Sequence, residues 1–77
     1  MVTYFKSQKD LAIAFIQLID NYWNYELSEE NLINQINELS SKNKEKLFID
    51  GQYSSVLKQR LVKRRIELLN KVLINKG

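Results

Sequence analysis

The sequence of 77 residues contains no cysteine, no histidine and no proline, and its only glycines are Gly51 and Gly77. Without cysteine there is no disulfide, no thiolate metal site and no cysteine nucleophile. Without histidine, the usual general base and most zinc and haem ligation are missing as well. Two isolated glycines cannot form a glycine-rich phosphate loop, and no spacing of acids matches an EF-hand. We therefore expect a protein that is not an enzyme, holds no metal and needs no cofactor.

The overall composition is that of one globular domain spanning residues 1–77. Apolar residues make up 44% of the chain and charged residues 27%, which is ordinary for a soluble domain. No apolar run approaches the roughly 18 residues of a membrane span. The N-terminus lacks the charged stretch and apolar core of a signal peptide. These features predict a cytoplasmic protein that does not use a membrane as a partner.

Charge is distributed unevenly along the chain. From Asp10 to Ser41 there are six acids and no basic residue, whereas from Lys42 to Gly77 there are ten basic residues and three acids. The tightest cluster places five cations in eight positions, namely Lys58, Arg60, Lys63, Arg64 and Arg65. Such a cluster is typical of a nucleic-acid contact. The alternative is that the acidic and basic halves neutralise each other inside the fold or a dimer.

Two amphipathic helices are expected in the first half of the chain. Ser7 followed by Asp10 resembles a capping box, and the apolar spacing that follows predicts a helix over Gln8–Tyr25. Ser28 precedes two glutamates whose charge suits a helix N-terminus. A second apolar stripe then predicts a helix over Glu29–Ser41.

The segment that follows has two interpretations. Lys44–Ile49 suits one short helical turn, and the residues around Asp50 and Gly51 suit a hairpin with a type I′ turn. An isolated two-stranded hairpin is only marginally stable. We therefore favour the helical turn followed by an Asp-Gly corner.

The last segment, Tyr53–Ile74, contains no helix breaker and predicts a long unbroken helix of roughly 33 Å. Its apolar arc covers about half of the helical circumference. The opposite side carries Arg60, Lys63, Arg64 and Lys71, whereas Lys58 and Arg65 interrupt the apolar arc. The expected fold class is thus all-α, a small bundle of three helices, or four with the short helical turn, with a long C-terminal helix.

A second copy of the chain is the expected partner for the surplus apolar surface. Two shorter helices in a chain of this size do not fully cover the arc, and small domains depend on good packing or on a second subunit. Aromatic residues at the end of the first helix are typical interface anchors. The predicted interface of a homodimer or a protein complex comprises Tyr22, Trp23, Tyr25, Val62, Ile66, Leu69 and Leu73.

Several segments carry a family resemblance: Tyr22-Trp23-Asn24-Tyr25, Ser28-Glu29-Glu30 and the stretch from Gly51 to Arg60. They resemble a family of short uncharacterised proteins from low-GC Gram-positive bacteria. That family continues with Gly-Lys-Lys-Arg, where this chain has Val62-Lys63-Arg64-Arg65. We expect the valine to strengthen the helix and to remove any kink there. The resemblance implies no substrate or catalytic residue, but it supports treating Tyr53, Lys58, Arg60 and Lys63–Arg65 as a unit.

The outline of a short helix, a turn and a long helix resembles a helix-turn-helix, whose second helix enters the major groove. The predicted function is therefore regulatory binding of DNA or RNA. The expected contacts are Ser54, Ser55, Lys58, Gln59, Arg60, Lys63, Arg64 and Arg65. The alternative is a small inhibitor or adaptor of the phage or mobile-element type. It would bind a protein target through the acidic N-terminal half or the helical interface.

Overall fold

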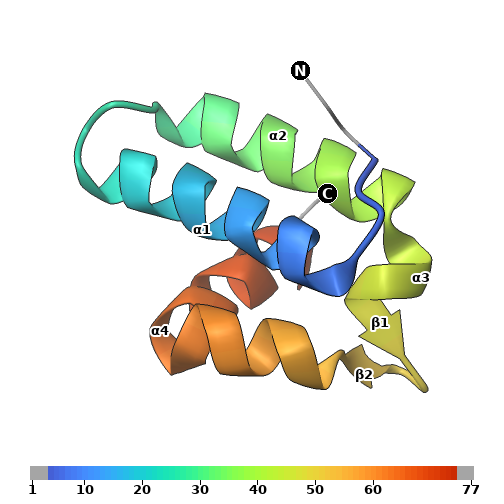
Figure 1. Ribbon diagram of the computed structural model, residues 1–77. Helices are drawn as coiled ribbons and strands as arrows, with labels where there is room; N and C mark the ends of the chain where they lie inside the picture. Colours follow the sequence, from blue (N-terminus) through green and yellow to red (C-terminus); the bar gives the residue numbers. More distant parts are fainter. Residues whose placement is uncertain (1–3, 75–77) are drawn as a thin grey trace.

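The computed structural model describes residues 4–74, which form a small helical bundle with one short hairpin (Figure 1). The elements follow the order α1 (Gln8–Trp23), α2 (Glu29–Lys42), α3 (Lys44–Leu47), β1 (Phe48–Ile49), β2 (Gln52–Tyr53) and α4 (Ser55–Ile74). This arrangement confirms the all-α fold class. None of the helices between residues 4 and 74 has the length and apolar character that a bilayer crossing requires.

Helices α1 and α2 form an antiparallel pair that begins where local signals place it. The Ser7 hydroxyl accepts a hydrogen bond from the Asp10 amide at 3.1 Å, and the Ser28 hydroxyl accepts one from the Asn31 amide at 3.2 Å. Helix α1 ends two residues before the predicted Tyr25, because Tyr25 takes a left-handed conformation with φ of 63°. Its amide donates to the Tyr22 carbonyl, which closes the last turn.

The segment after α2 contains both of the structures that the sequence allows. Helix α3 is a single turn, and the hairpin pairs Phe48 with Tyr53 across Asp50 and Gly51, both at positive φ. The preference for a helical turn is thus confirmed for α3, but it is wrong for the residues after it. The Phe48 and Tyr53 rings stack at 5.1 Å across the hairpin, and a tertiary contact joins it to α4, because the Tyr53 hydroxyl lies 3.4 Å from the Asn70 side-chain oxygen.

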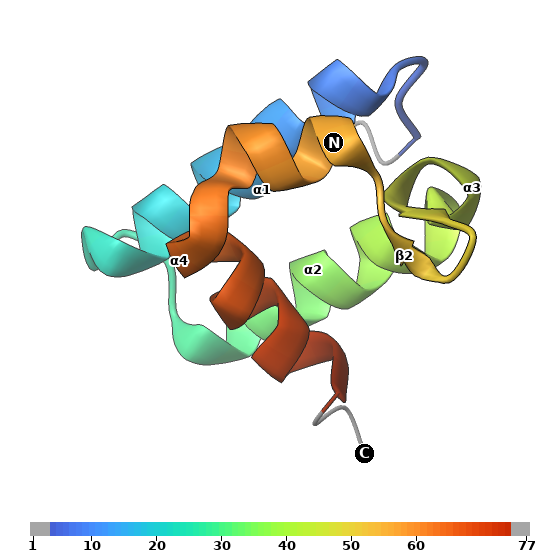
Figure 2. The same ribbon diagram turned by 90° about the horizontal axis from the view of Figure 1, so that it is seen from below.

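Helix α4 is long, as predicted, but it is not the straight rod that the sequence predicts. Val62 has φ 59° and ψ 176°, which is not helical, and it divides α4 into a first arm, residues 55–61, and a second arm, residues 63–74. Figure 2 shows the first arm running beside α1 and the second arm turning towards α2. The expectation that valine removes a kink at this position is therefore wrong.

The bend in α4 places both of its arms on the same core. Leu57 and Leu61 from the first arm and Leu69 and Val72 from the second are buried with the apolar faces of α1 and α2. A straight helix would carry the second arm away from α2 and leave this surface in water. The bend therefore covers much of the apolar arc for which the sequence required a second copy.

Leu69 corrects one interface prediction directly. Its side chain is fully buried in the core of the single chain, so it does not lie on the surface of this structure, where a partner could dock. Ile66 and Leu73 are only partly buried against that core, and Val62 is 49% exposed. The homodimer itself stays a prediction.

Candidate nucleic-acid interface

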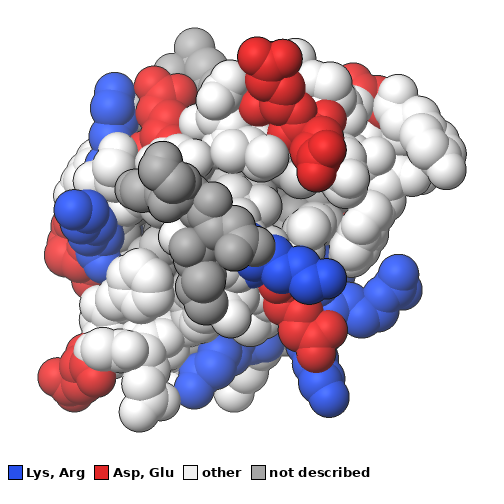
Figure 3. Space-filling model, turned by 180° about the vertical axis from the view of Figure 1, so that it is seen from behind, with Lys and Arg blue, Asp and Glu red and all other residues white. Residues whose placement is uncertain are grey.

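The predicted nucleic-acid contacts lie on α4, and most of them reach solvent. Ser55 and Gln59 are exposed, as are four cations that we call the basic bend: Lys58, Arg60, Lys63 and Arg64. In Figure 3, several basic side chains lie in the lower half of the molecule, where α4 lies, with acidic side chains among them, and a group of acidic side chains lies in the upper part. The fold thus keeps the charge asymmetry of the sequence only in part.

The four cations of the basic bend are free of ion pairs in the part of the chain that the structure describes. Lys58 and Arg60 lie on the first arm, and Lys63 and Arg64 lie just beyond Val62 on the second. The cations therefore follow a corner rather than one straight helical face.

Arg65 does not belong to this exposed set. Its Nε and Nη2 atoms donate to the Asp20 carboxylate at distances from 2.9 to 3.1 Å, and its Nη1 donates to the Leu61 carbonyl at 3.3 Å. The prediction that Arg65 contacts nucleic acid is wrong, because the bend turns its guanidinium towards α1. There it links α1 to both arms of α4.

Trp23 lies beneath two arginines at the bend. The Arg64 Cζ is 4.9 Å from the centroid of the indole ring, and the Arg65 Cζ is 5.8 Å from it. Cations at these distances are attracted to the face of the ring. Trp23 is partly buried, and its ring attracts the Arg64 guanidinium.

The other predicted interface aromatics differ in exposure. Tyr22 is half-buried against the core, whereas Tyr25 is 97% exposed. Of the three aromatic residues at the end of α1, only Tyr25 is fully available to another molecule.

Ser54 has a structural role instead of the predicted contact. It is buried, and its hydroxyl accepts a hydrogen bond from the Leu57 amide at 3.2 Å, which caps the N-terminus of α4. The helix-turn-helix outline is not met either, because a hairpin separates α3 from α4 and α3 is only one turn long. Base readout by a conventional recognition helix therefore has no support in this fold.

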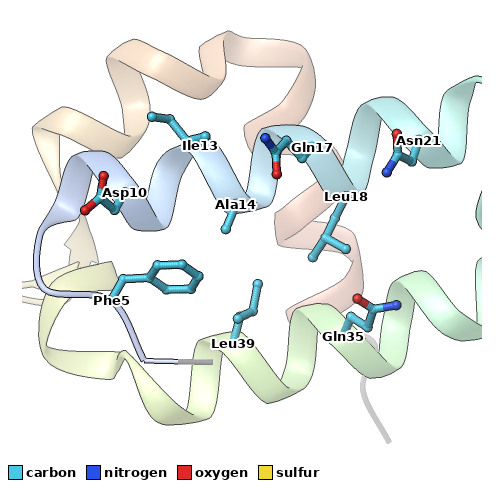
Figure 4. Close-up of a pocket in the computed structure, with 9 residues that line it drawn as sticks. All are labelled: Phe5, Asp10, Ile13, Ala14, Gln17, Leu18, Asn21, Gln35 and Leu39. Carbon is cyan, nitrogen blue, oxygen red and sulfur yellow. The ribbon is translucent and has the colours of Figure 1, made fainter. Parts of the chain in front are cut away.

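Sequence patterns did not identify the groove between α1 and α2. It has a volume of about 580 Å³, and Phe5 from the N-terminal segment points into it beside Ala14 and Leu39 (Figure 4). The Phe5 amide donates to the buried Asn43 side chain at 3.0 Å, and the Asn43 amide group donates to the Leu39 carbonyl at 2.8 Å. Asn43 thus ties the N-terminal segment to α2, a link that only the folded chain reveals.

Two shifted pKa values mark contacts away from the basic bend. The Tyr4 hydroxyl, 2.8 Å from the Lys46 ammonium, raises the pKa of Lys46 by accepting its hydrogen bond. Burial raises the pKa of Tyr53, whose hydroxyl lies 3.4 Å from the Asn70 side-chain oxygen. Both contacts join segments distant in sequence, and both are structural.

Fold and surface together define a small all-helical protein with an exposed cationic corner. Residues 2–74 match the model of a family described as "Conserved hypothetical protein", so the chain belongs to that family. The match confirms the resemblance seen in the sequence and assigns no activity; the low-GC Gram-positive origin stays a prediction. No curated protein and no solved structure matches the chain.

Proposed function

We propose that this protein is a small non-enzymatic regulator of the cytoplasm that binds nucleic acid through the basic bend. One observation carries the proposal: four exposed cations within seven positions have no acidic partner in the described part of the chain. Unpaired positive charge attracts a polyanion and speeds its encounter with the protein. The net charge of +3 acts in the same direction.

The geometry of the basic bend favours phosphate contacts over base readout. The Arg64 guanidinium lies 4.9 Å from the Trp23 ring, and this attraction favours an ordered guanidinium, which lowers the entropy lost when it binds a phosphate. Ser55 and Gln59 are exposed on the first arm and offer hydrogen-bonding groups beside the cations. Contacts with phosphates fix position without selecting sequence, so we expect binding with little sequence preference.

A titration against salt tests the proposal. Four phosphate contacts predict a log–log slope of about −3.6 for a duplex and about −2.8 for a single strand. Fluorescence anisotropy of a labelled duplex and a labelled single strand, measured from 50 to 200 mM salt, gives both slopes. Affinity that does not change with salt, or no binding at 50 mM, contradicts the proposal.

Charge reversal with a matched control locates the site. The triple variant Arg60→Glu, Lys63→Glu and Arg64→Glu changes the net charge from +3 to −3 and should weaken binding by more than about tenfold. The control reverses three exposed lysines outside α4, Lys6, Lys9 and Lys44, for the same net charge. Equal losses in both variants would show that only bulk charge matters.

The acidic residues of α2 support a second candidate function, an inhibitor or adaptor. Glu29, Glu30 and Glu38 are all exposed and can dock on a basic protein surface. If the protein acts in this way, reversing these three charges should abolish whatever change in growth the protein causes when it is expressed in a cell. The triple variant of the basic bend would keep that effect. The opposite result supports nucleic-acid binding.

A further inference from the structure

The bend at Val62 opposes the local preference of the chain. Its φ of 59° and ψ of 176° lie in a region that only glycine adopts readily, and valine is β-branched. Residues 53–74 contain no glycine and no proline, so nothing in the local sequence requires the helix to stop. A straight α4 would return Val62 to helical dihedral angles.

Contacts made by the second arm hold the bend. Leu69 and Val72 are buried against the apolar faces of α1 and α2. Arg65 binds Asp20 on α1 and the carbonyl of Leu61 at the end of the first arm. Except for the contact with Leu61, these interactions join the second arm to helices that precede the bend, so a second copy of the chain can supply them equally well.

We propose that α4 straightens at Val62 and that two copies of this chain exchange their second arms. In the exchanged dimer each second arm packs on α1 and α2 of the partner, so the buried contacts of the monomer are remade between copies. Both valines leave the strained conformation. The surface vacated by one arm matches only that arm, so its occupant is a second copy. This dimer does not depend on nucleic-acid binding.

Complementary charge variants test the exchange directly. A chain with Asp20→Arg places two arginines together, and a chain with Arg65→Asp places two aspartates together, so neither chain regains the pair alone. When the two variants are refolded as a mixture, an exchanged heterodimer restores both pairs. Native mass spectrometry should show a 1:1 heterodimer in the mixture that neither variant forms by itself. A mixture that stays monomeric overturns the proposal.

Two substitutions at the hinge provide a second test. Val62→Gly removes the backbone strain of the bent conformation and so favours the monomer, whereas Val62→Ala favours the straight helix. Position 62 is 49% exposed, so neither substitution removes much packing. Sedimentation equilibrium should give an association constant for the dimer that is at least about tenfold lower for Val62→Gly than for Val62→Ala. Equal constants would show that residue 62 is not the hinge and would also overturn the proposal.

Discussion

The α1–α2 pair and α4 differ in how well the local sequence preference agrees with the packing of the core. In the pair, the caps Ser7 and Ser28 and the apolar spacing agree with the packing, and the predicted helix starts are exact. In α4 the local sequence favours one straight helix, and the core instead requires a bend at Val62. Where local and tertiary preferences agree, the sequence is sufficient. Where they conflict, the larger buried area decides.

The two opposing free energies in α4, backbone strain at Val62 and burial of the second arm, are each of a few kcal/mol. A β-branched residue held at backbone dihedral angles that suit glycine lowers the stability of the fold by about 1–3 kcal/mol. Burial of one leucine side chain stabilises a fold by about 1.5–3 kcal/mol. Because the bend allows Leu69 and Val72 to reach the core, the burial outweighs the strain at Val62.

The strongest test of this comparison is to remove the side chain that anchors the second arm. Leu69 is fully buried, so Leu69→Ala should lower the free energy of unfolding by about 2–5 kcal/mol. Urea denaturation followed by circular dichroism measures the change. Leu73→Ala is the matched control, because Leu73 is only partly buried and should have a smaller effect. Equal and small effects would mean that the second arm does not belong to the core.

The next effect concerns the ion pair that links α1 to the bend. Arg65→Met keeps much of the side-chain length but removes the hydrogen bonds to Asp20 and Leu61. Both charged side chains keep some exposure, so we expect a loss of about 1–2 kcal/mol in unfolding free energy. A double-mutant cycle with Asp20→Asn should show that most of this loss is shared. Additive losses would contradict a direct pair.

A smaller and opposite effect comes from glycine at two of the positions with positive φ, Val62 and Tyr25. Val62→Gly should raise the free energy of unfolding by about 1 kcal/mol, since relief of strain exceeds the added entropy of the unfolded chain. Tyr25→Gly, at a left-handed helix end, should gain less, because Tyr25 is not β-branched. Thermal unfolding compares the two. A loss of stability for Val62→Gly would contradict a strained bend.

The smallest difference separates two serine caps. Ser28→Ala removes an exposed cap of α2 and should lower stability by about 1 kcal/mol. Ser54→Ala removes a buried cap of α4 and leaves the Leu57 amide without its partner, so its loss should be somewhat larger. Chemical denaturation of both variants under one set of conditions gives the order. The reverse order would show that burial adds nothing to the cap.

Most helices and the exposed cations could be predicted from the sequence, because caps and apolar periodicity act over a few residues. The pairing of Arg65 with Asp20 could not, since the two residues are 45 positions apart and sequence alone shows only two charges of opposite sign. The burial of Ser54 could not be predicted either, because a serine before a helix is equally compatible with a cap and with a surface contact.

Local patterns of residues suffice to predict three features: the all-helical class, the ends of α1 and α2 to within two residues, and the cluster of charge on α4. Three other features depend on packing between distant segments: the bend of α4, the inward turn of Arg65 and the formation of the hairpin beside α3. The two groups of features differ in the distance along the chain over which the responsible interactions act. Helix propensity and capping are local terms of about 1 kcal/mol or less per residue. Closing one core over both arms of α4 sums several buried leucines from distant parts of the chain and exceeds those local terms.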